Sequence, residues 1–293
     1  MTVQTQPQAT RDLRQAARQG LLPARGSGWL AGFGNMLAKE LGEWFRTRRW
    51  IWQLLIWLII IDGFVVLMLF VLPALAAMMP ALKPTVDATF AGLPPEVWGL
   101  SSYFTLLGFA GILGVVILAQ DEIIQEKQTG TAAWILSKPA SRQAFILTKL
   151  LSNIIGALVF IVLVPGLVAW ILNYLATHTG VPLATFLAGV GVIMLGLIFY
   201  ISLVILLGVL FESRGPVLGI AFGILIGGMM LRNFIPPILY VLPLSMDGVG
   251  MAVVMGMPLP AFMVSQVIST AVLSIAFILV ALWRFQHKEF LAG

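Results

Sequence analysis

The chain has 293 residues, of which 60% are hydrophobic and 10% are charged, and its mean hydropathy is +1.01. Water-soluble domains carry about 25% charged residues, so this composition excludes a soluble fold and predicts an all-α polytopic membrane protein. The absence of cysteine excludes disulfides, thiolate metal sites and cysteine nucleophiles, and the net charge of +5 indicates membrane orientation rather than binding to nucleic acid.

The first 28 residues are polar and rich in arginine, and they lack the early apolar stretch of a secretory signal. We interpret residues 1–28 as a mobile cytoplasmic tail, or as a basic tail that touches anionic lipid headgroups. Residues 29–49 place apolar side chains at helical spacing, opposite Lys39, Glu40, Glu43 and Arg46. This pattern favours an amphipathic helix in the cytoplasmic interface; the alternative is that it merely extends the first span.

A membrane-spanning helix needs about 20 mostly apolar residues. Six stretches meet this condition, at residues 50–72, 97–119, 150–174, 185–210, 217–234 and 261–283. We therefore expect a single six-helix transmembrane domain over residues 50–284, followed by a cytoplasmic tail at 285–293.

Lysine and arginine are distributed unevenly between the two sides of the expected membrane. Fifteen of the 17 lie on one side, and only Lys83 and Arg232 lie on the other. Because cytoplasmic loops carry the excess of basic residues, both termini are predicted to be cytoplasmic, with the chain in a cell (plasma) membrane. The external segment 233–260 is too apolar for an ordinary loop and too rich in proline and glycine to span. We interpret it as re-entrant helices between the fifth and sixth spans, or alternatively as a compact hydrophobic lid.

The connection between the second and third spans, residues 120–149, is the most informative segment. The second span is expected to continue as a charged helix that stops at Gly130, where glycine can adopt the left-handed conformation. Thr131 can then cap a short helix at 132–137, which Pro139 ends, and Ser141 can cap the helix of the third span. The apolar residues of the short helix are Trp134, Ile135 and Leu136. An exposed apolar knob of this kind usually marks a protein partner.

These residues resemble the signature of the ABC-2 type transporter permeases. The matching positions are Glu126, Gly130 and Thr131, then Leu136, Ser137, Pro139, Ser141 and Arg142, and finally Lys149. The basic amphipathic segment before the first span, the six spans and the external insertion resemble the same family from about residue 29 onward. Ile135 and Leu136 stand where two leucines are usual.

The resemblance implies the transmembrane subunit of an ATP-driven exporter. Its implied partners are a second permease and ATP-binding cassette subunits that carry ATP and Mg, with no cofactor in this chain. The helix at 131–138 would be the coupling helix that binds in a groove of the ATPase. Glu126 and Arg142 would be the charges that pair with the ATPase. The residues expected to couple the two subunits are Glu122, Glu126, Gly130, Thr131, Trp134, Ile135, Leu136, Pro139, Ser141 and Arg142.

The chain lacks a phosphate-binding P-loop, because none of its six lysines follows a glycine. It is therefore predicted not to be an enzyme, and ATP hydrolysis is expected in a partner chain. The rival hypotheses are a gradient-driven secondary transporter that uses Asp62, and a membrane scaffold or sensor that moves no substrate.

Asp62 lies near the middle of the first span, where a carboxylate costs about 2.5–3.5 kcal/mol to insert. It should therefore face the bundle interior or water, either in a substrate pathway or dimer interface or as a structural carboxylate bonded to a neighbouring helix. Two spans carry glycine-rich faces that let helices approach closely, and the one on the fifth span is either a contact between two permeases or packed inside one chain. They are Gly219, Gly223 and Gly227 in the fifth span, and Gly108, Gly111 and Gly114 in the second. No metal site is predicted, and the external methionines are interpreted as flexible packing side chains rather than copper ligands.

Overall fold

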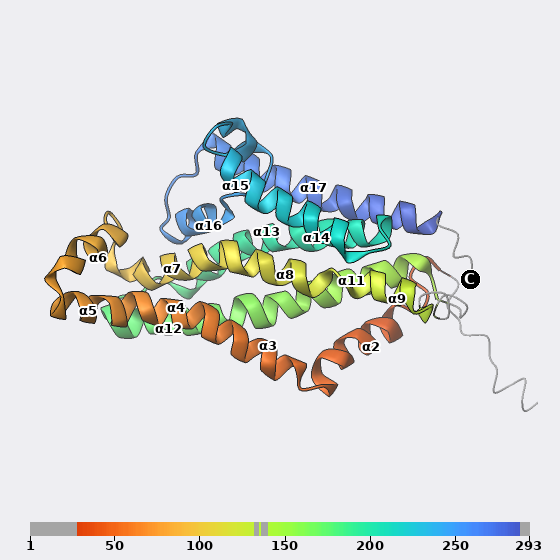
Figure 1. Ribbon diagram of the computed structural model, residues 1–293, viewed down its shortest axis with the longest axis horizontal. Coiled ribbons are helices and arrows are strands. Elements are labelled where there is room, and N and C mark those ends of the chain that lie inside the picture. The colour runs from red at the N-terminus through yellow and green to blue at the C-terminus, as the bar shows by residue number, and fades with distance from the viewer. Residues whose placement is uncertain (1–27, 132–134, 136–139, 288–293) are drawn as a thin grey trace, which may run out of the picture.

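The computed structural model describes residues 28–131, 135 and 140–287. Every regular element that it describes is a helix, and the long ones run side by side along one axis (Figure 1). Six are long and apolar enough to cross a membrane: Trp50–Met78, Pro95–Gln128, Arg142–Thr177, Leu183–Leu210, Arg214–Leu231 and Ala261–Gln286. The prediction of an all-helical, multi-pass membrane protein with six such helices is confirmed.

Most of these six helices are built from consecutive segments. The first comprises α3 (Arg49–Trp57), η1 (Leu58–Asp62), α4 (Gly63–Val66), η2 (Leu67–Val71) and α5 (Leu72–Met78). The second comprises η4 (Pro95–Val97), α7 (Trp98–Leu106), η5 (Leu107–Gly111), α8 (Ile112–Ala119) and α9 (Glu122–Gln128). The third comprises α11 (Arg142–Gly156), η6 (Ala157–Leu163) and α12 (Val164–Thr177). The fourth is α13 (Leu183–Leu210), the fifth comprises α14 (Arg214–Phe222), η7 (Gly223–Gly227) and α15 (Gly228–Leu231), and the sixth is α17 (Ala261–Gln286).

Shorter helices flank the bundle at both ends. One end carries α2 (Phe33–Arg46), and the opposite end carries η3 (Pro80–Leu82), α6 (Lys83–Thr89), η8 (Pro236–Tyr240) and α16 (Met246–Val254) (Figure 1). Thr47, directly after α2, has an extended backbone, and a new helix begins at Arg49. The alternative in which residues 29–49 merely extend the first span is therefore wrong, because the chain turns between two separate helices.

The centre of the bundle is α13. Its 28 residues include no Asp, Glu, Lys or Arg, and most of its residues are buried, whereas few residues of α17 are. A helix that is apolar on every side is stable only when neighbours surround it, and α13 packs against α8, α9, α11, α14, α16 and α17. Gly189 of α13 and Gly250 of α16 face each other so closely that a Cβ on Gly189 would lie 2.7 Å from the carbonyl oxygen of Gly250.

Four of the six candidate spans contain a π-helical segment. In the third span this segment, η6, ends directly before Val164 and Pro165. Proline has no backbone N–H and clashes with the carbonyl four residues earlier, so a widened turn accommodates it inside a long helix. In the first span, η1 ends at Asp62, which places the intramembrane carboxylate on an irregular turn.

Candidate functional site

A buried lysine at the start of the third span gathers carboxylates from two other helices. The Lys149 Nζ atom on α11 lies 2.8 Å from the Glu40 Oε2 atom of α2 and 2.9 Å from the Glu126 Oε1 atom of α9. Glu122, also on α9, approaches it to 3.3 Å. The side chains of Lys149 and Glu40 are only 5% and 8% exposed. We call these four residues the Lys149 cluster.

The three carboxylates of the Lys149 cluster compensate the charge of the Lys149 ammonium, which would otherwise be costly to bury. Removing a charge from water costs several kcal/mol, and the cost is recovered only when partners with good geometry surround it. A second cation, Lys39, lies 3.7 Å from Glu126 and 3.5 Å from Glu43 at the exposed edge. Because the three carboxylates come from α2 and α9, the ammonium of α11 joins three helices at one point.

Aromatic packing holds α2 in the same place. The ring of Trp44 stacks on Phe160 of η6 with centroids 5.4 Å apart. A Cβ on Gly156 of α11 would lie 2.8 Å from the Trp44 ring, so only glycine leaves room for the indole there. Thus α2 is fixed against the third span by both charge and shape.

A second lysine fastens α9 to the end of the central helix. The Nζ atom of Lys127 donates to the carbonyl oxygens of Gly208 and Phe211, at 2.9 and 2.6 Å, and lies 3.2 Å from Glu212. The last carbonyls of a helix have no partner within the helix, and a cation there is favourable. Beside it, Arg214 of α14 pairs with Asp121 at 2.7 Å. The charged extension of the second span is therefore bound to both α13 and α14.

Ser141 and Arg142 attach the start of the third span to the residues just before α2 and to the end of α17. The Ser141 Oγ atom accepts from the Ala144 N–H at 3.0 Å, which is the helix cap that the sequence predicts. The same hydroxyl donates to the Trp29 carbonyl, and the Ser141 N–H donates to the Ala31 carbonyl at 2.9 Å. Arg142 donates from Nη1 to the carbonyl of Gln286 at the end of α17, at 3.0 Å.

The predicted coupling residues fall into three groups. Glu122, Glu126, Ser141 and Arg142 hold the connection to the rest of the chain. Gly130 has φ +71°, the left-handed conformation expected of it, and the hydroxyl of Thr131 lies 2.8 Å from that of Thr129. Ile135 is half-buried against the main core. Trp134, Leu136 and Pro139, and with them most of the expected short helix, lie outside the described residues.

Within the described residues, Glu126 and Arg142 both contact the chain itself, and their pairing with a partner stays a prediction. The side chain of Glu126 is 13% exposed and turned toward Lys149, and Arg142 donates to the end of α17. A buried lysine needs counter-charges from its own chain, and a helix end offers unpaired carbonyls, so both side chains are engaged internally.

Sequence reasoning did not identify the roles of Glu40 and Lys127. A signal for the first was available: Lys149 begins an apolar stretch, so it requires a buried acidic partner, and Glu40 lies in an amphipathic segment beside its apolar face. No comparable signal exists for Lys127, because its acceptors are backbone carbonyls more than 80 residues away in the sequence.

Asp62 faces the bundle interior, where η1 contacts α7 and α12. The residue is 6% exposed, and neither carboxylate oxygen has a hydrogen-bond partner among the described residues. Its neighbour on α7, Tyr103, directs its hydroxyl elsewhere, to the carbonyl of Val162 at 2.7 Å. The interpretation of Asp62 as a carboxylate hydrogen-bonded to a neighbouring helix therefore has no support within the part of the chain that the structure describes.

The two glycine faces differ. A Cβ on Gly108 would meet Asp247, and one on Gly114 would meet the ring of Trp57, so the face on the second span packs inside the chain. Around Gly219, Gly223 and Gly227, a Cβ would meet no described atom within 4 Å. Within the part of the chain that the structure describes, nothing packs against this fifth-span face, which points outward, and its contact with a second permease stays a prediction.

Comparison with known proteins places the chain in a family. A search of curated proteins finds no match. Residues 65–291 match a family described as "Protein of unknown function (DUF2705)". The match spans most of the chain, from the first span through α17. The chain therefore belongs to the DUF2705 family.

Proposed function

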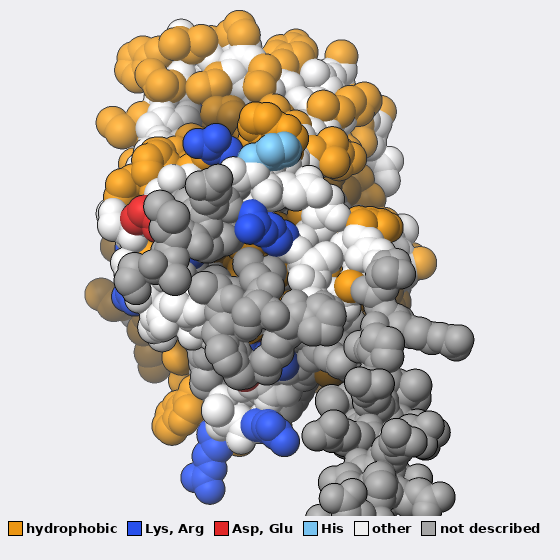
Figure 2. All heavy atoms as spheres, turned by 90° about the vertical axis from the view of Figure 1, so that its right-hand side faces the viewer, with side chains coloured by type: hydrophobic (Ala, Val, Ile, Leu, Met, Phe, Trp, Pro, Cys, Tyr) orange, Lys and Arg blue, Asp and Glu red, His pale blue; other side chains and the backbone are white. Residues whose placement is uncertain are grey.

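We propose that the chain is the transmembrane permease subunit of an ATP-driven transporter of the ABC-2 type, working as an exporter. In this proposal its N- and C-termini lie in the cytoplasm of a plasma-membrane protein, α2 lies in the cytoplasmic interface, and α16 belongs to a re-entrant segment on the outer face. Figure 2 looks at the end of the molecule that carries α2 and α9 and shows Lys and Arg side chains exposed there, with apolar flanks around them. An excess of basic residues favours the cytoplasmic side.

One observation carries the proposal: the 120–149 connection is bound to several helices at once. Lys149 joins it to α2, Lys127 joins it to the end of α13, and Arg142 joins it to the end of α17. A force applied by a partner to residues 131–138 would act on all of these helices together, because each of these contacts is short. Such a mechanical link is what ATP-driven switching between inward- and outward-facing states requires.

The proposal implies two kinds of partner. An ATP-binding cassette subunit, with ATP and Mg, would bind the helix at 131–138. A second permease copy, or a homologous permease, would pack on the outward glycine face of the fifth span, where small residues permit close helix contact. The chain itself would perform no hydrolysis.

A nucleotide-labelling pull-down tests the ATPase partner. Wild type and Trp134→Ala would be purified from native membranes after photolabelling with azido-ATP, and Trp283→Ala, an exposed tryptophan at the same end of the bundle, serves as the control. We expect a labelled subunit with wild type and with Trp283→Ala, and loss of it with Trp134→Ala. No labelled subunit with wild type, or equal recovery with Trp134→Ala, would contradict the proposal.

A second candidate function, gradient-driven secondary transport, is favoured by Asp62 alone. A buried carboxylate with two unpartnered oxygens is suited to bind and release a proton or a cation during transport. In this case Asp62→Asn would abolish gradient-driven transport, whereas Trp134→Ala would leave it unchanged.

A further inference from the structure

A cavity of about 170 Å³ lies among the second, fourth and fifth spans and α16, at the end of the bundle opposite the Lys149 cluster. Its polar residues are Arg232, which directly follows α15, Asp247 in the first turn of α16, and Thr105 of α7. The apolar residues include Leu225, Met229, Ile112, Phe109 and Leu197. The cavity is thus charged at some points and hydrocarbon-like at others.

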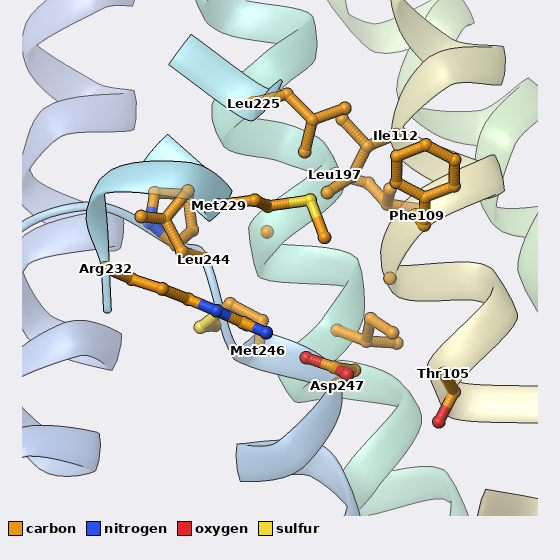
Figure 3. A pocket seen from close by; sticks show the side chains of 14 residues that line it. Thr105, Phe109, Ile112, Leu197, Leu225, Met229, Arg232, Leu244, Met246 and Asp247 are labelled. Carbon is orange, nitrogen blue, oxygen red and sulfur yellow. The ribbon is translucent and has the colours of Figure 1, made fainter. Parts of the chain in front are cut away.

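The charged residues lie on one side of the cavity together with Met246 and Leu244, and the other side is apolar (Figure 3). Figure 3 shows Arg232, Asp247 and Thr105 on one side, and Leu225, Ile112, Leu197 and Phe109 on the other. Leu225 precedes Arg232 by seven residues, and Ile112 follows Thr105 by seven, so both helices go from polar to apolar over about 10 Å. On both helices, the residues become more apolar from the end of the fifth span toward its middle.

The expected depth of the cavity's charged residues in the bilayer matches that of a lipid headgroup. The fifth span, Arg214–Leu231, has 18 residues, which as a helix cover about 27 Å, close to the thickness of the hydrocarbon core. Arg232 directly follows it and is therefore expected at the bilayer surface, while Leu225 and Ile112 lie within the hydrocarbon region. Thr105 and Phe109 are exposed, whereas Ile112 and Leu225 are buried, so the cavity is reached past the exposed face of the second span.

Arg232 and Asp247 face each other without closing into a pair. Figure 3 shows the guanidinium and the carboxylate directed toward the same space. Among the described residues, the ion pairs within 4.0 Å all lie at the other end of the bundle, and neither of these two residues takes part in one. Burial raises the pKa of Asp247, and hydrogen bonds from the backbone N–H groups of Gly248 and Asp247, together with the charge of Arg232, oppose this. A cation and an anion held apart in one cavity are complementary to a ligand that carries both charges.

The position of Asp247 is fixed by the packing around it. A Cβ on Gly108 would lie 2.8 Å from the Cβ of Asp247, and a Cβ on Gly196 would lie 3.2 Å from Met246. Glycine at both positions therefore lets the first turn of α16 approach the second and fourth spans. The carboxylate is placed by the fold rather than by a mobile loop.

From these observations we propose that this cavity binds the zwitterionic headgroup of a phospholipid, with its phosphate on Arg232, its ammonium on Asp247 and the start of an acyl chain along Leu225, Met229 and Phe109. Guanidinium groups bind phosphate oxygens in a bidentate manner, and a carboxylate accepts from an ammonium. Ligand pockets for whole drug-sized molecules measure about 300–1,000 Å³, so this cavity admits a headgroup and leaves most of the lipid outside. The site does not depend on the proposed ATPase partner.

Native mass spectrometry of the full chain, released from membranes containing equal amounts of phosphatidylethanolamine and phosphatidylglycerol, tests the site. We expect wild type to retain phosphatidylethanolamine preferentially. Arg232→Gln should reduce the retention of both lipids by about tenfold or more, because the charge-assisted hydrogen bonds of the guanidinium are lost. Asp247→Asn should reduce only the retention of phosphatidylethanolamine, because phosphatidylglycerol has a phosphate but no ammonium.

Controls come from the same end of the bundle. Lys83→Gln and Asp87→Asn remove exposed charges that line other hollows there, and they should leave lipid retention unchanged. Free phosphoethanolamine, which lacks acyl chains, should not displace the bound lipid at equal concentration. Displacement would reassign the site to a soluble zwitterion, and equal retention of both lipids by wild type, or unchanged retention in both cavity variants, would overturn the proposal.

Discussion

The ammonium of Lys149 lies 2.8 Å from the carboxylate of Glu40, although 109 residues separate them in the sequence. This contact joins the helix before the first span to the start of the third, inside an environment that excludes most water. Glu126 and Glu122 complete the site from α9. The consequences of this buried pairing can be measured directly.

Replacing Lys149 with methionine should destabilise the protein strongly. The substitution leaves three carboxylates close together without their cation, and breaking a buried pair in this way costs about 3–5 kcal/mol. The unfolding temperature in detergent, followed by size-exclusion fluorescence, measures the effect. Lys39→Met is the matched control: Lys39 is 47% exposed, and an exposed pair contributes about 0–1 kcal/mol. Equal losses from the two substitutions would contradict the central role of Lys149.

Gly156→Ala should displace α2 from the third span. The new methyl group would lie 2.8 Å from the Trp44 ring, which is packed on Phe160 and has little freedom to move. Overpacking of this kind costs about 1–3 kcal/mol. The fluorescence of the displaced tryptophan and the unfolding temperature should both change. Gly42→Ala, where the added methyl meets nothing within 4 Å, should be neutral or stabilising by about 0.5–1 kcal/mol.

A cysteine on the outward glycine face should report contact with a second copy. The chain has no cysteine, so Gly219→Cys supplies its only thiol. If two copies pack along the fifth span, oxidation should give a disulfide-linked dimer, because close helices bring Cα atoms within about 4.4–6.8 Å. Ile275→Cys, 57% exposed on α17, should remain monomeric. Dimer formation by both variants, or by the α17 variant alone, would exclude the fifth-span contact.

Asp62→Leu should leave the stability unchanged or raise it. The carboxylate is buried without a hydrogen-bond partner among the described residues, and removing such a group recovers its desolvation penalty of about 1–3 kcal/mol. Asn173→Leu is the contrasting variant. Its amide accepts from Gly99 N–H at 2.6 Å and donates to the Glu96 carbonyl at 2.7 Å, so its loss should lower the unfolding temperature. A marked loss of stability with Asp62→Leu would mean that a bound cation or a second chain partners the carboxylate.

The local features of the fold could be read from the sequence. Long apolar stretches determine where helices able to cross a membrane form, because a buried backbone must satisfy its own hydrogen bonds. The stop at Gly130 and the cap at Ser141 are equally local, since they depend on one residue's conformation or on a side chain reaching three residues ahead. The sequence also indicates that Asp62 faces inward, because a lipid-facing carboxylate is too costly.

The tertiary structure decided which groups meet. The sequence offers several partners for Lys149, and only the packing of α2 on α11 selects Glu40. Likewise, the second and fifth spans both carry regularly repeated glycines, yet one face is filled by Trp57 and Asp247 and the other meets no described atom. The same packing brings Arg232 and Asp247 to one cavity from two different elements. Such contacts depend on the relative positions of helices far apart in the chain, which local propensity and hydrophobic period do not specify.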